Sequence, residues 1–141
     1  MFHEPSPAIA MDAKAVKRPV VLLVDDDVPT ARVLARLLSE DGYAVEIASD
    51  GAAAIRRLTR DPLPDVLITD MTMPFADGVT VTRYARSRRA NLPVFVITGS
   101  PSLVTRRAAD IDPPPIVLTK PLHYESFSAE LRRAVPVAKK P

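Results

Sequence analysis

The chain has 141 residues, enough for one compact domain, and its hydrophobic fraction of 47% is high enough to build a packed core. It contains no cysteine, which excludes a disulfide framework and thiolate metal sites and fits a cytoplasmic protein. The net charge of +2 comes from the two ends, because residues 19–135 carry 14 basic and 15 acidic side chains. This near-neutral centre argues against a nucleic-acid-binding surface, and no apolar run is long enough to cross a membrane.

Three segments divide the chain. Residues 1–18 mix proline, alanine and charge without periodicity, so we expect a flexible leader, and we expect residues 136–141 to form a flexible tail. Residues 19–135 alternate short apolar runs with helical patterns and should form the folded domain. The six residues after Val135 are too few for a DNA-binding domain, so we expect no direct binding to DNA.

The folded segment predicts five strand–helix units. In chain order they are strand 19–24, a helix between Pro29 and Gly42, strand 44–48, helix 52–60, strand 65–70, helix 77–89, strand 93–98, helix 102–109, strand 116–119 and helix 123–135. The first strand is a continuous apolar run, as in strands buried on both faces of a parallel sheet. Proline near the start and glycine after the end are typical of helix boundaries.

This alternation predicts an α/β fold, with a parallel sheet covered by helices on both faces. Right-handed crossovers leave few topologies for five strands. The simplest is the flavodoxin-like, doubly wound (βα)5 sheet with strand order 2-1-3-4-5. Ligands of such sheets bind outside the carboxyl ends of the strands, so the residues at those ends are candidates for a functional site.

Polar side chains follow the carboxyl ends of four predicted strands. They are Asp25, Asp26 and Asp27 after the first strand, Asp70 at the end of the third, Thr98 at the end of the fourth, and Lys120 after the fifth. Each has an ordinary structural explanation when taken alone; Asp27, for example, could equally be a helix N-cap. Their joint placement at one edge of the sheet favours a functional site.

The carboxylates of Asp25, Asp26 and Asp70 would repel one another at this edge. At about 5 Å and an effective dielectric constant of ~20, each pair costs about 3 kcal/mol, which is large beside the ~5–15 kcal/mol stability of a small domain. Protons or cations must relieve that repulsion. Mg²⁺ suits the task because it binds one or two carboxylates and accepts phosphate oxygens. Lys120 would add a compact positive charge for a phosphoryl group.

Four segments carry a resemblance to a known family. They are residues 21–27 (VLLVDDD), 65–74 (DVLITDMTMP), 94–99 (VFVITG) and 118–121 (LTKP). In content and spacing they resemble the receiver domains of response regulators in bacterial two-component signalling, of the single-domain chemotaxis-regulator type. Asp77 and Gly78 fall where that family has an Asp-Gly pair. The resemblance covers about residues 19–135.

The resemblance implies a phosphorylation site. Asp70 would be the phosphoacceptor, a carboxylate nucleophile that attacks phosphorus. Asp25 and Asp26 would bind Mg²⁺, with Asp70 and the main-chain carbonyl of Thr72 as the remaining protein ligands.

Two further residues have roles implied by the resemblance. Lys120 would hold one phosphoryl oxygen, and Thr98 would turn its hydroxyl toward another. The peptide bond between Lys120 and Pro121 would be cis, as is usual in the family.

The family also implies partners. A histidine kinase or a histidine phosphotransfer protein would supply the phosphoryl group, and a downstream protein of unknown identity would read the result. The domain would not be an enzyme, because it would only undergo its own phosphorylation and dephosphorylation. We expect a cytoplasmic monomer or weak homodimer that does not contact a membrane.

Three features depart from the family pattern. Val117 stands where an aromatic residue is usual, three residues before Lys120, so the usual coupling of that aromatic to the site hydroxyl is missing. Gly99 stands where alanine is common. Residues 110–115 end in three prolines, which favour a stiff extended segment and suggest either a rigid connector or a docking surface.

Two other functions stay open. A receiver that does not phosphorylate would serve as a constitutive docking module, and Val117 keeps that reading open. A haloacid-dehalogenase-like phosphatase would use Asp25 as nucleophile and Asp27 as acid, but it would leave Asp70 unexplained. The arginines within residues 83–89 lack interleaved aromatic residues, so we interpret them as a solvated face rather than a nucleic-acid patch.

Overall fold

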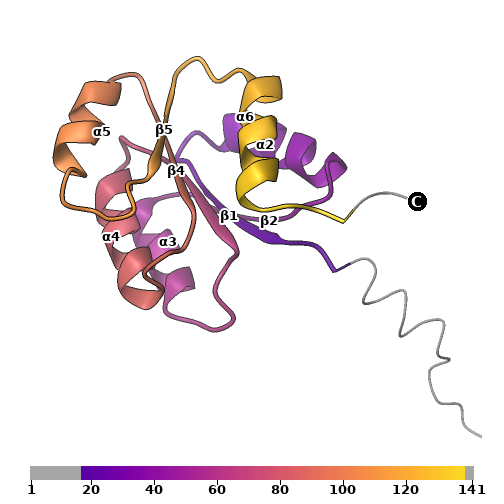
Figure 1. Ribbon diagram of the computed structural model, residues 1–141, viewed down its shortest axis with the longest axis horizontal. Coiled ribbons are helices and arrows are strands. Elements are labelled where there is room, and N and C mark those ends of the chain that lie inside the picture. Colours follow the sequence, from indigo (N-terminus) through magenta and orange to yellow (C-terminus); the bar gives the residue numbers. More distant parts are fainter. Residues whose placement is uncertain (1–16, 139–141) are drawn as a thin grey trace, which may run out of the picture.

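The computed structural model describes residues 17–138, so residues 1–16 of the predicted leader (1–18) and residues 139–141 of the predicted tail (136–141) lie outside the described part (Figure 1). The described elements are β1 (Val20–Val24), α2 (Val28–Glu40), β2 (Ala44–Ala48), α3 (Gly51–Leu58), β3 (Val66–Asp70), α4 (Gly78–Arg88), β4 (Val94–Thr98), α5 (Pro101–Arg107), β5 (Ile116–Thr119) and α6 (Tyr124–Ala134). Each predicted strand and helix is present, with boundaries that differ by at most a few residues.

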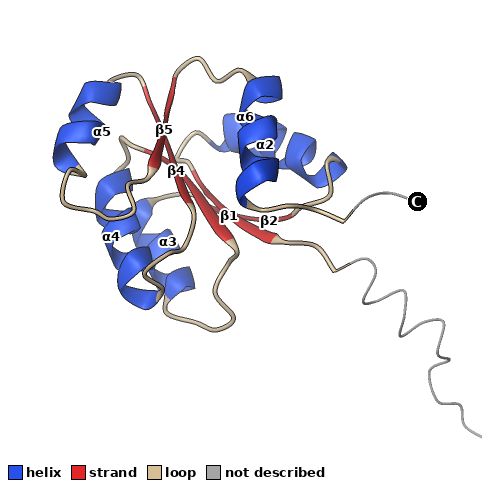
Figure 2. Cartoon of the chain, in the orientation of Figure 1, coloured by secondary structure: helices blue, strands red, loops and turns tan. Residues whose placement is uncertain are grey.

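The strands form one parallel sheet in the order β2-β1-β3-β4-β5, which confirms the predicted fold class and strand order. Helices α2 and α6 cover one face of the sheet, and α3, α4 and α5 cover the other (Figure 2). Because all five strands point the same way, their carboxyl ends meet at one edge of the sheet.

The burial of each strand follows its place in the sheet. All residues of β3 and β4 are buried, as are four of the five in β1, because these central strands have helices on both faces. The edge strands β2 and β5 are largely half-exposed or exposed. Within residues 17–138, no helix is long and apolar enough to cross a membrane.

Aspartates set where three helices begin at the carboxyl edge. The side chains of Asp27, Asp50 and Asp77 are N-caps of α2, α3 and α4, and each accepts a hydrogen bond from the amide three residues on. Such caps satisfy amides that lack partners inside the helix. The loops from β1, β2 and β3 into these helices are therefore anchored close to the strand ends.

Packing continues into the start of the predicted tail. Val137 is half-buried against the core between the sheet and helices α2 and α6, and it lies beside Gly42. The packed part of the chain therefore extends to Val137.

Candidate functional site

Three carboxylates converge at the carboxyl edge of the sheet. One carboxylate oxygen from each of Asp25, Asp26 and Asp70 lies within 4.8 Å of the other two. Asp70 ends the central strand β3 and is 7% exposed, whereas Asp25 is half-buried and Asp26 is exposed. The sequence analysis selected these three residues, and the fold brings them together.

Asp25 is oriented by the turn that follows β1. Its Oδ1 accepts a hydrogen bond of 2.9 Å from the amide of Asp27. Burial is the main cause that raises the pKa of Asp25 above its ordinary value, and the negative charge of Asp70 raises it further, although the bond from Asp27 opposes both. The carboxylate is thus held in a site where a nearby cation would favour its charged form.

Lys120 supplies a positive charge directly against the buried carboxylate. Its Nζ lies 2.8 Å from Oδ1 of Asp70, and this polar contact is the main cause that raises the pKa of Lys120, against the effect of burial. Oδ1 is buried, and within the described part of the chain the ammonium is its ion-pair partner. The contact is therefore an ion pair, and the oxygen keeps its capacity to accept a ligand.

Thr98 lies at the end of β4 and is 4% exposed. Its hydroxyl oxygen accepts a hydrogen bond of 2.9 Å from the amide of Ser100, at the start of α5. The carbonyl of Thr98 accepts a bond of 2.8 Å from the amide of Lys120, which fixes the backbone of the lysine beside β4. The peptide bond between Lys120 and Pro121 is cis, as predicted.

Thr72 is exposed in the loop at residues 71–77 that joins β3 to α4. This loop is bound at both ends: the amide of Met71 donates to the carbonyl of Ile97, and the amide of Gly78 donates to the carbonyl of Met71. The loop that carries the predicted carbonyl ligand is thus closed at its base and bound to β4, the neighbour of the strand that bears Asp70.

Asp27 is an N-cap and not a member of the carboxylate cluster. Both of its oxygens face Thr30, one accepting from the amide at 3.4 Å and the other from the hydroxyl at 2.9 Å. The phosphatase scheme needed Asp27 as a free acid, and these bonds give it a structural role instead.

The acidic site opens into a cavity of about 860 Å³ with two chemically different parts. One part holds the three carboxylates and Lys120. The other is apolar and lies between α2 and the segment from β5 to α6; it includes Val33, Leu34, Leu37, Leu122 and Tyr124. Val33 is 64% exposed. The sequence analysis identified the charged part but not this apolar part.

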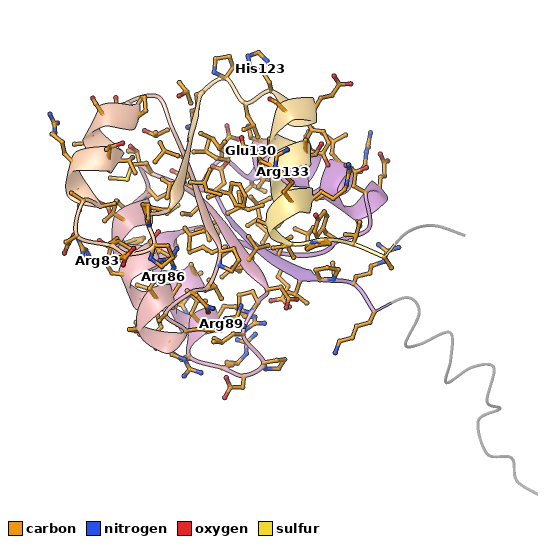
Figure 3. All side chains as sticks on the ribbon, in the orientation of Figure 1. Arg83, Arg86, Arg89, His123, Glu130 and Arg133 are labelled. Carbon is orange, nitrogen blue, oxygen red and sulfur yellow. The ribbon has the colours of Figure 1, made fainter. Side chains whose placement is uncertain are left out.

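The arginines of α4 bind within the protein. Arg83 pairs with Asp110, Arg88 pairs with Asp61, and Arg86 donates to the main chain at Leu92. Figure 3 shows Arg83 and Arg86 on α4, beneath α5 in the view. Arg89, directly after α4, is the fourth arginine of this group. The interpretation of the group as a solvated face was incomplete, because the other three tie α4 to neighbouring segments.

The proline segment at residues 110–115 is attached to the domain. Arg86 donates to the carbonyl of Pro113, and Ile111 and Pro115 are buried. These contacts agree with a rigid connector between α5 and β5. Val117, in place of the usual aromatic residue, is half-buried in β5.

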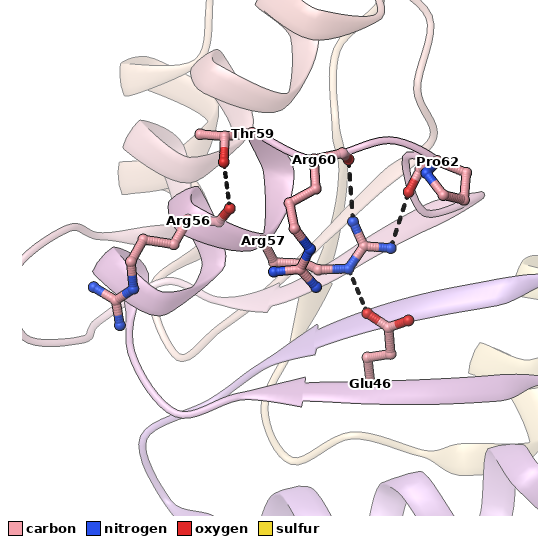
Figure 4. Close-up of polar contacts among 6 residues, drawn as sticks. All are labelled: Glu46, Arg56, Arg57, Thr59, Arg60 and Pro62. Atoms are coloured by element: carbon pink, nitrogen blue, oxygen red, sulfur yellow. Dashed lines mark hydrogen bonds and ion pairs between the residues drawn. The ribbon is translucent and has the colours of Figure 1, made fainter.

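A second cavity, of about 410 Å³, lies at the opposite edge of the sheet. Its central cation, Arg57, is already bound: it donates to Glu46 at 2.5 Å and to the carbonyls of Arg60 and Pro62 at 3.4 and 3.0 Å (Figure 4). These bonds hold the loop after α3 against β2, so Arg57 has a structural role that no local sequence pattern had indicated.

Comparison with known proteins gives the family. Residues 21–132 match the model of the response regulator receiver domain. The chain is 41% identical over 113 residues to Response regulator MprA of Mycobacterium leprae, covering 79% of this chain and 49% of that protein. It is 39% identical over 113 residues to Response regulator MprA of Mycobacterium tuberculosis, covering 79% of this chain and 48% of that protein. The chain thus spans about half the length of the curated relatives it matches.

Solved structures agree. The chemotaxis response regulator CheY4 of Vibrio cholerae aligns with a TM-score of 0.74 at 27% identity, over 84% of this chain and 100% of that chain. A response regulator receiver protein from Sinorhizobium medicae aligns with a TM-score of 0.76 at 26% identity, over 88% and 99%. The fold and the matched family define a signalling domain of two-component systems. This chain belongs to the response regulator receiver domain family.

Proposed function

We propose that the domain is a phosphorylatable receiver in which Asp70 accepts a phosphoryl group in a Mg²⁺-dependent reaction. The observation that carries the proposal is the surroundings of Asp70. Its carboxylate is buried at the end of the central strand, lies 2.8 Å from the ammonium of Lys120, and has two further carboxylates close by.

The donor set fits Mg²⁺. Asp25, Asp26 and Asp70 offer oxygens within 4.8 Å of one another, and among the described residues the buried Oδ1 of Asp70 has an ion-pair contact with Lys120 but no further polar partner. Hard oxygen ligands of this kind suit a cation that keeps several waters and also accepts phosphate oxygens. The carbonyl of Thr72 would complete the protein ligands. When bound, the cation supplies positive charge to the transferring phosphoryl group.

The residues of the chain account for the rest of the transfer. A carboxylate oxygen of Asp70 attacks phosphorus, and the bond from phosphorus to the donor's imidazole nitrogen breaks, with its electron pair going to nitrogen. The ammonium of Lys120 then binds a phosphoryl oxygen. The hydroxyl of Thr98 leaves the amide of Ser100 and donates to another phosphoryl oxygen, which couples the site to the start of α5.

The donor in this proposal is a histidine kinase or a histidine phosphotransfer protein. The apolar part of the cavity supports a protein donor, because exposed Val33 lies on the same opening as the acceptor. The receiver itself acts in the cytoplasm as a monomer or weak homodimer, and it signals to a downstream protein by contact. It turns over no separate substrate.

The test is phosphorylation by a small donor. The protein is incubated with Mg²⁺ and acetyl phosphate, and its intact mass is measured, with Asp70→Asn and EDTA as controls. We expect one added phosphoryl group in the wild type and none in either control. If the phosphoryl adduct hydrolyses before its mass can be measured, binding of beryllofluoride is measured instead, by amide shifts in NMR spectra. If neither an adduct nor beryllofluoride binding is found, the proposal fails and a constitutive docking module takes its place.

A further inference from the structure

The acceptor loop, defined as residues 71–77, is held by a side chain from another helix. Asp77 ends this loop and caps α4, accepting a hydrogen bond of 2.9 Å at Oδ1 from the amide of Thr80. Its other oxygen, Oδ2, forms an ion pair with the guanidinium of Arg107, in the last turn of α5. The loop that joins the acceptor strand to α4 is thus tied to α5, thirty residues further along the chain.

The pair is partly shielded from water. The side chain of Asp77 is 25% exposed and that of Arg107 is 43% exposed. The pKa of Asp77 lies below its ordinary value, because the hydrogen bonds from Thr80 and Arg107 outweigh the opposing effect of burial. The carboxylate is therefore charged at neutral pH and available to the guanidinium.

A second arginine binds the same end of α5 without reaching the loop. Arg83, on α4, donates to the carbonyl of Arg107 at 2.8 Å and to both oxygens of Asp110 at 3.0 and 2.9 Å. Among the described residues, Arg107 forms an ion pair with the acceptor loop, whereas the polar contacts of Arg83 are with Arg107 and Asp110. This difference supplies a matched control.

Helix α5 therefore contacts the candidate site at both ends. At its start, the amide of Ser100 donates to the hydroxyl of Thr98; at its end, Arg107 binds Asp77. The position where family members usually carry an aromatic residue is Val117, whose small side chain cannot serve as a large moving group between the site and α5.

We infer that Arg107 is a positioning residue for the acceptor loop, and that the ion pair between Arg107 and Asp77 couples the candidate site to α5. The inference rests on the proposed function in taking this loop as part of a cation and phosphoryl site. If the pair stabilises the loop position in which the site binds Mg²⁺, its loss weakens Mg²⁺ binding. Because coupling between two sites is reciprocal, ligands at the site must also change the protection of α5 through the same pair.

The experiment compares Arg107→Gln, Arg107→Lys and Arg83→Gln with the wild type. Mg²⁺ affinity is measured by titration followed in amide NMR spectra, and hydrogen exchange of residues 101–107 is measured with and without Mg²⁺ and beryllofluoride. We expect Arg107→Gln to weaken Mg²⁺ binding about three- to fivefold, in line with a partly exposed ion pair, and to reduce the ligand-dependent change in exchange. Arg107→Lys should keep most of the Mg²⁺ affinity and most of the ligand-dependent change in exchange. Arg83→Gln should leave the Mg²⁺ affinity within about twofold of the wild type.

Three outcomes would overturn the inference. Unchanged Mg²⁺ affinity and exchange in Arg107→Gln would remove the coupling, and equal effects of Arg83→Gln and Arg107→Gln would assign the change to general packing of α5. A wild type that binds no Mg²⁺ would also overturn it. The failure of the proposed function looks different: Mg²⁺ would bind and respond to Arg107→Gln while Asp70 gained no phosphoryl group from acetyl phosphate.

Discussion

Gly51 lies where the acceptor loop crosses the start of α3, and it provides a sharp test of how the site is supported. A Cβ at this position would meet the carbonyl oxygen of Ala76 at 2.1 Å, its Cβ at 2.7 Å and its carbonyl carbon at 2.8 Å. Two of these are main-chain atoms, so no side-chain rotation can relieve the contact, and the loop must retreat by roughly 1 Å. We expect Gly51→Ala to displace the loop that carries Thr72 and Asp77.

The magnitude follows from the competing terms. Overpacking of this kind costs about 1–3 kcal/mol, and the better helix propensity of alanine returns at most about 1 kcal/mol. From the middle of the overpacking range, ~2 kcal/mol, the net loss is about 1–2 kcal/mol. That loss lowers the melting temperature of a domain of this size by about 3–10 °C. Mg²⁺ binding should weaken in the same variant.

The control for this variant is Gly99→Ala. Among residues 17–138, no heavy atom lies within 4 Å of a Cβ placed at Gly99, so alanine there should leave the melting temperature unchanged or slightly higher. Both variants are compared by thermal unfolding and by Mg²⁺ titration. Equal melting temperatures for Gly51→Ala and Gly99→Ala would refute the steric reasoning.

Four further predictions follow from individual contacts. Tyr43→Phe should lower the free energy of unfolding in urea by about 1–2 kcal/mol, because it leaves the carbonyl of Val135 without its buried 2.8 Å hydrogen bond; no loss would mean that water replaces the bond. Phe75→Asn should stabilise by about 0.5–1 kcal/mol, because Phe75 has φ +73° and is 85% exposed, and a lower melting temperature would show that its ring packs. Asp26→Asn should raise the melting temperature in EDTA by relieving repulsion, and should shrink the rise produced by Mg²⁺; an undiminished rise would remove Asp26 from the ligand set. The pKa of Asp77 is lowered, so its stabilisation is present above about pH 4 and lost as pH falls through the folded-state pKa. Asp77→Asn keeps the cap, so its loss of stability in urea melts should be largest at pH 7 and should shrink as the pH falls below about 4, and a loss independent of pH would contradict this.

Local pattern was sufficient to predict the elements. The strand Ala44–Ala48 was predicted with its exact bounds because Gly42 ends the helix before it and Asp50 caps the helix after it. Helix ends were less accurate: α3 was expected at residues 52–60 and ends at Leu58. The residues after Leu58 form a turn in which the carbonyls of Arg60 and Pro62 accept hydrogen bonds from Arg57. That arginine is held in turn by Glu46 on the neighbouring strand β2, a contact outside the helix pattern.

The members of the candidate site were also predictable from the sequence. A parallel sheet places all carboxyl ends of its strands at one edge, so polar residues that follow successive apolar runs must gather there. Asp25, Asp26, Asp27, Asp70, Thr98 and Lys120 were selected on this ground, and the structure brings them to that edge, where Asp27 caps α2. Their chemical roles stay proposals.

The supporting contacts were not predictable in the same way. Arg107 binds Asp77 thirty residues away, and Arg83 binds Asp110 at a separation of 27. Nothing in the local sequence distinguishes these arginines from solvated ones, because the choice of partner depends on how α4 and α5 pack on the sheet. Gly51 gave no signal either. A side chain is excluded at this position only because the acceptor loop crosses the start of α3 there.

The sequence by itself determined the fold class, the strand order and the residues at the carboxyl edge. Periodicity in the sequence identifies the strands and helices, and in a parallel sheet the residue that follows each strand must lie at the carboxyl edge. Only the tertiary structure decided how the three consecutive aspartates divide their roles. Asp25 and Asp26 face Asp70, whereas Asp27 caps α2. That division depends on the turn from β1 into α2, whose direction is set by the packing of both elements against the rest of the domain.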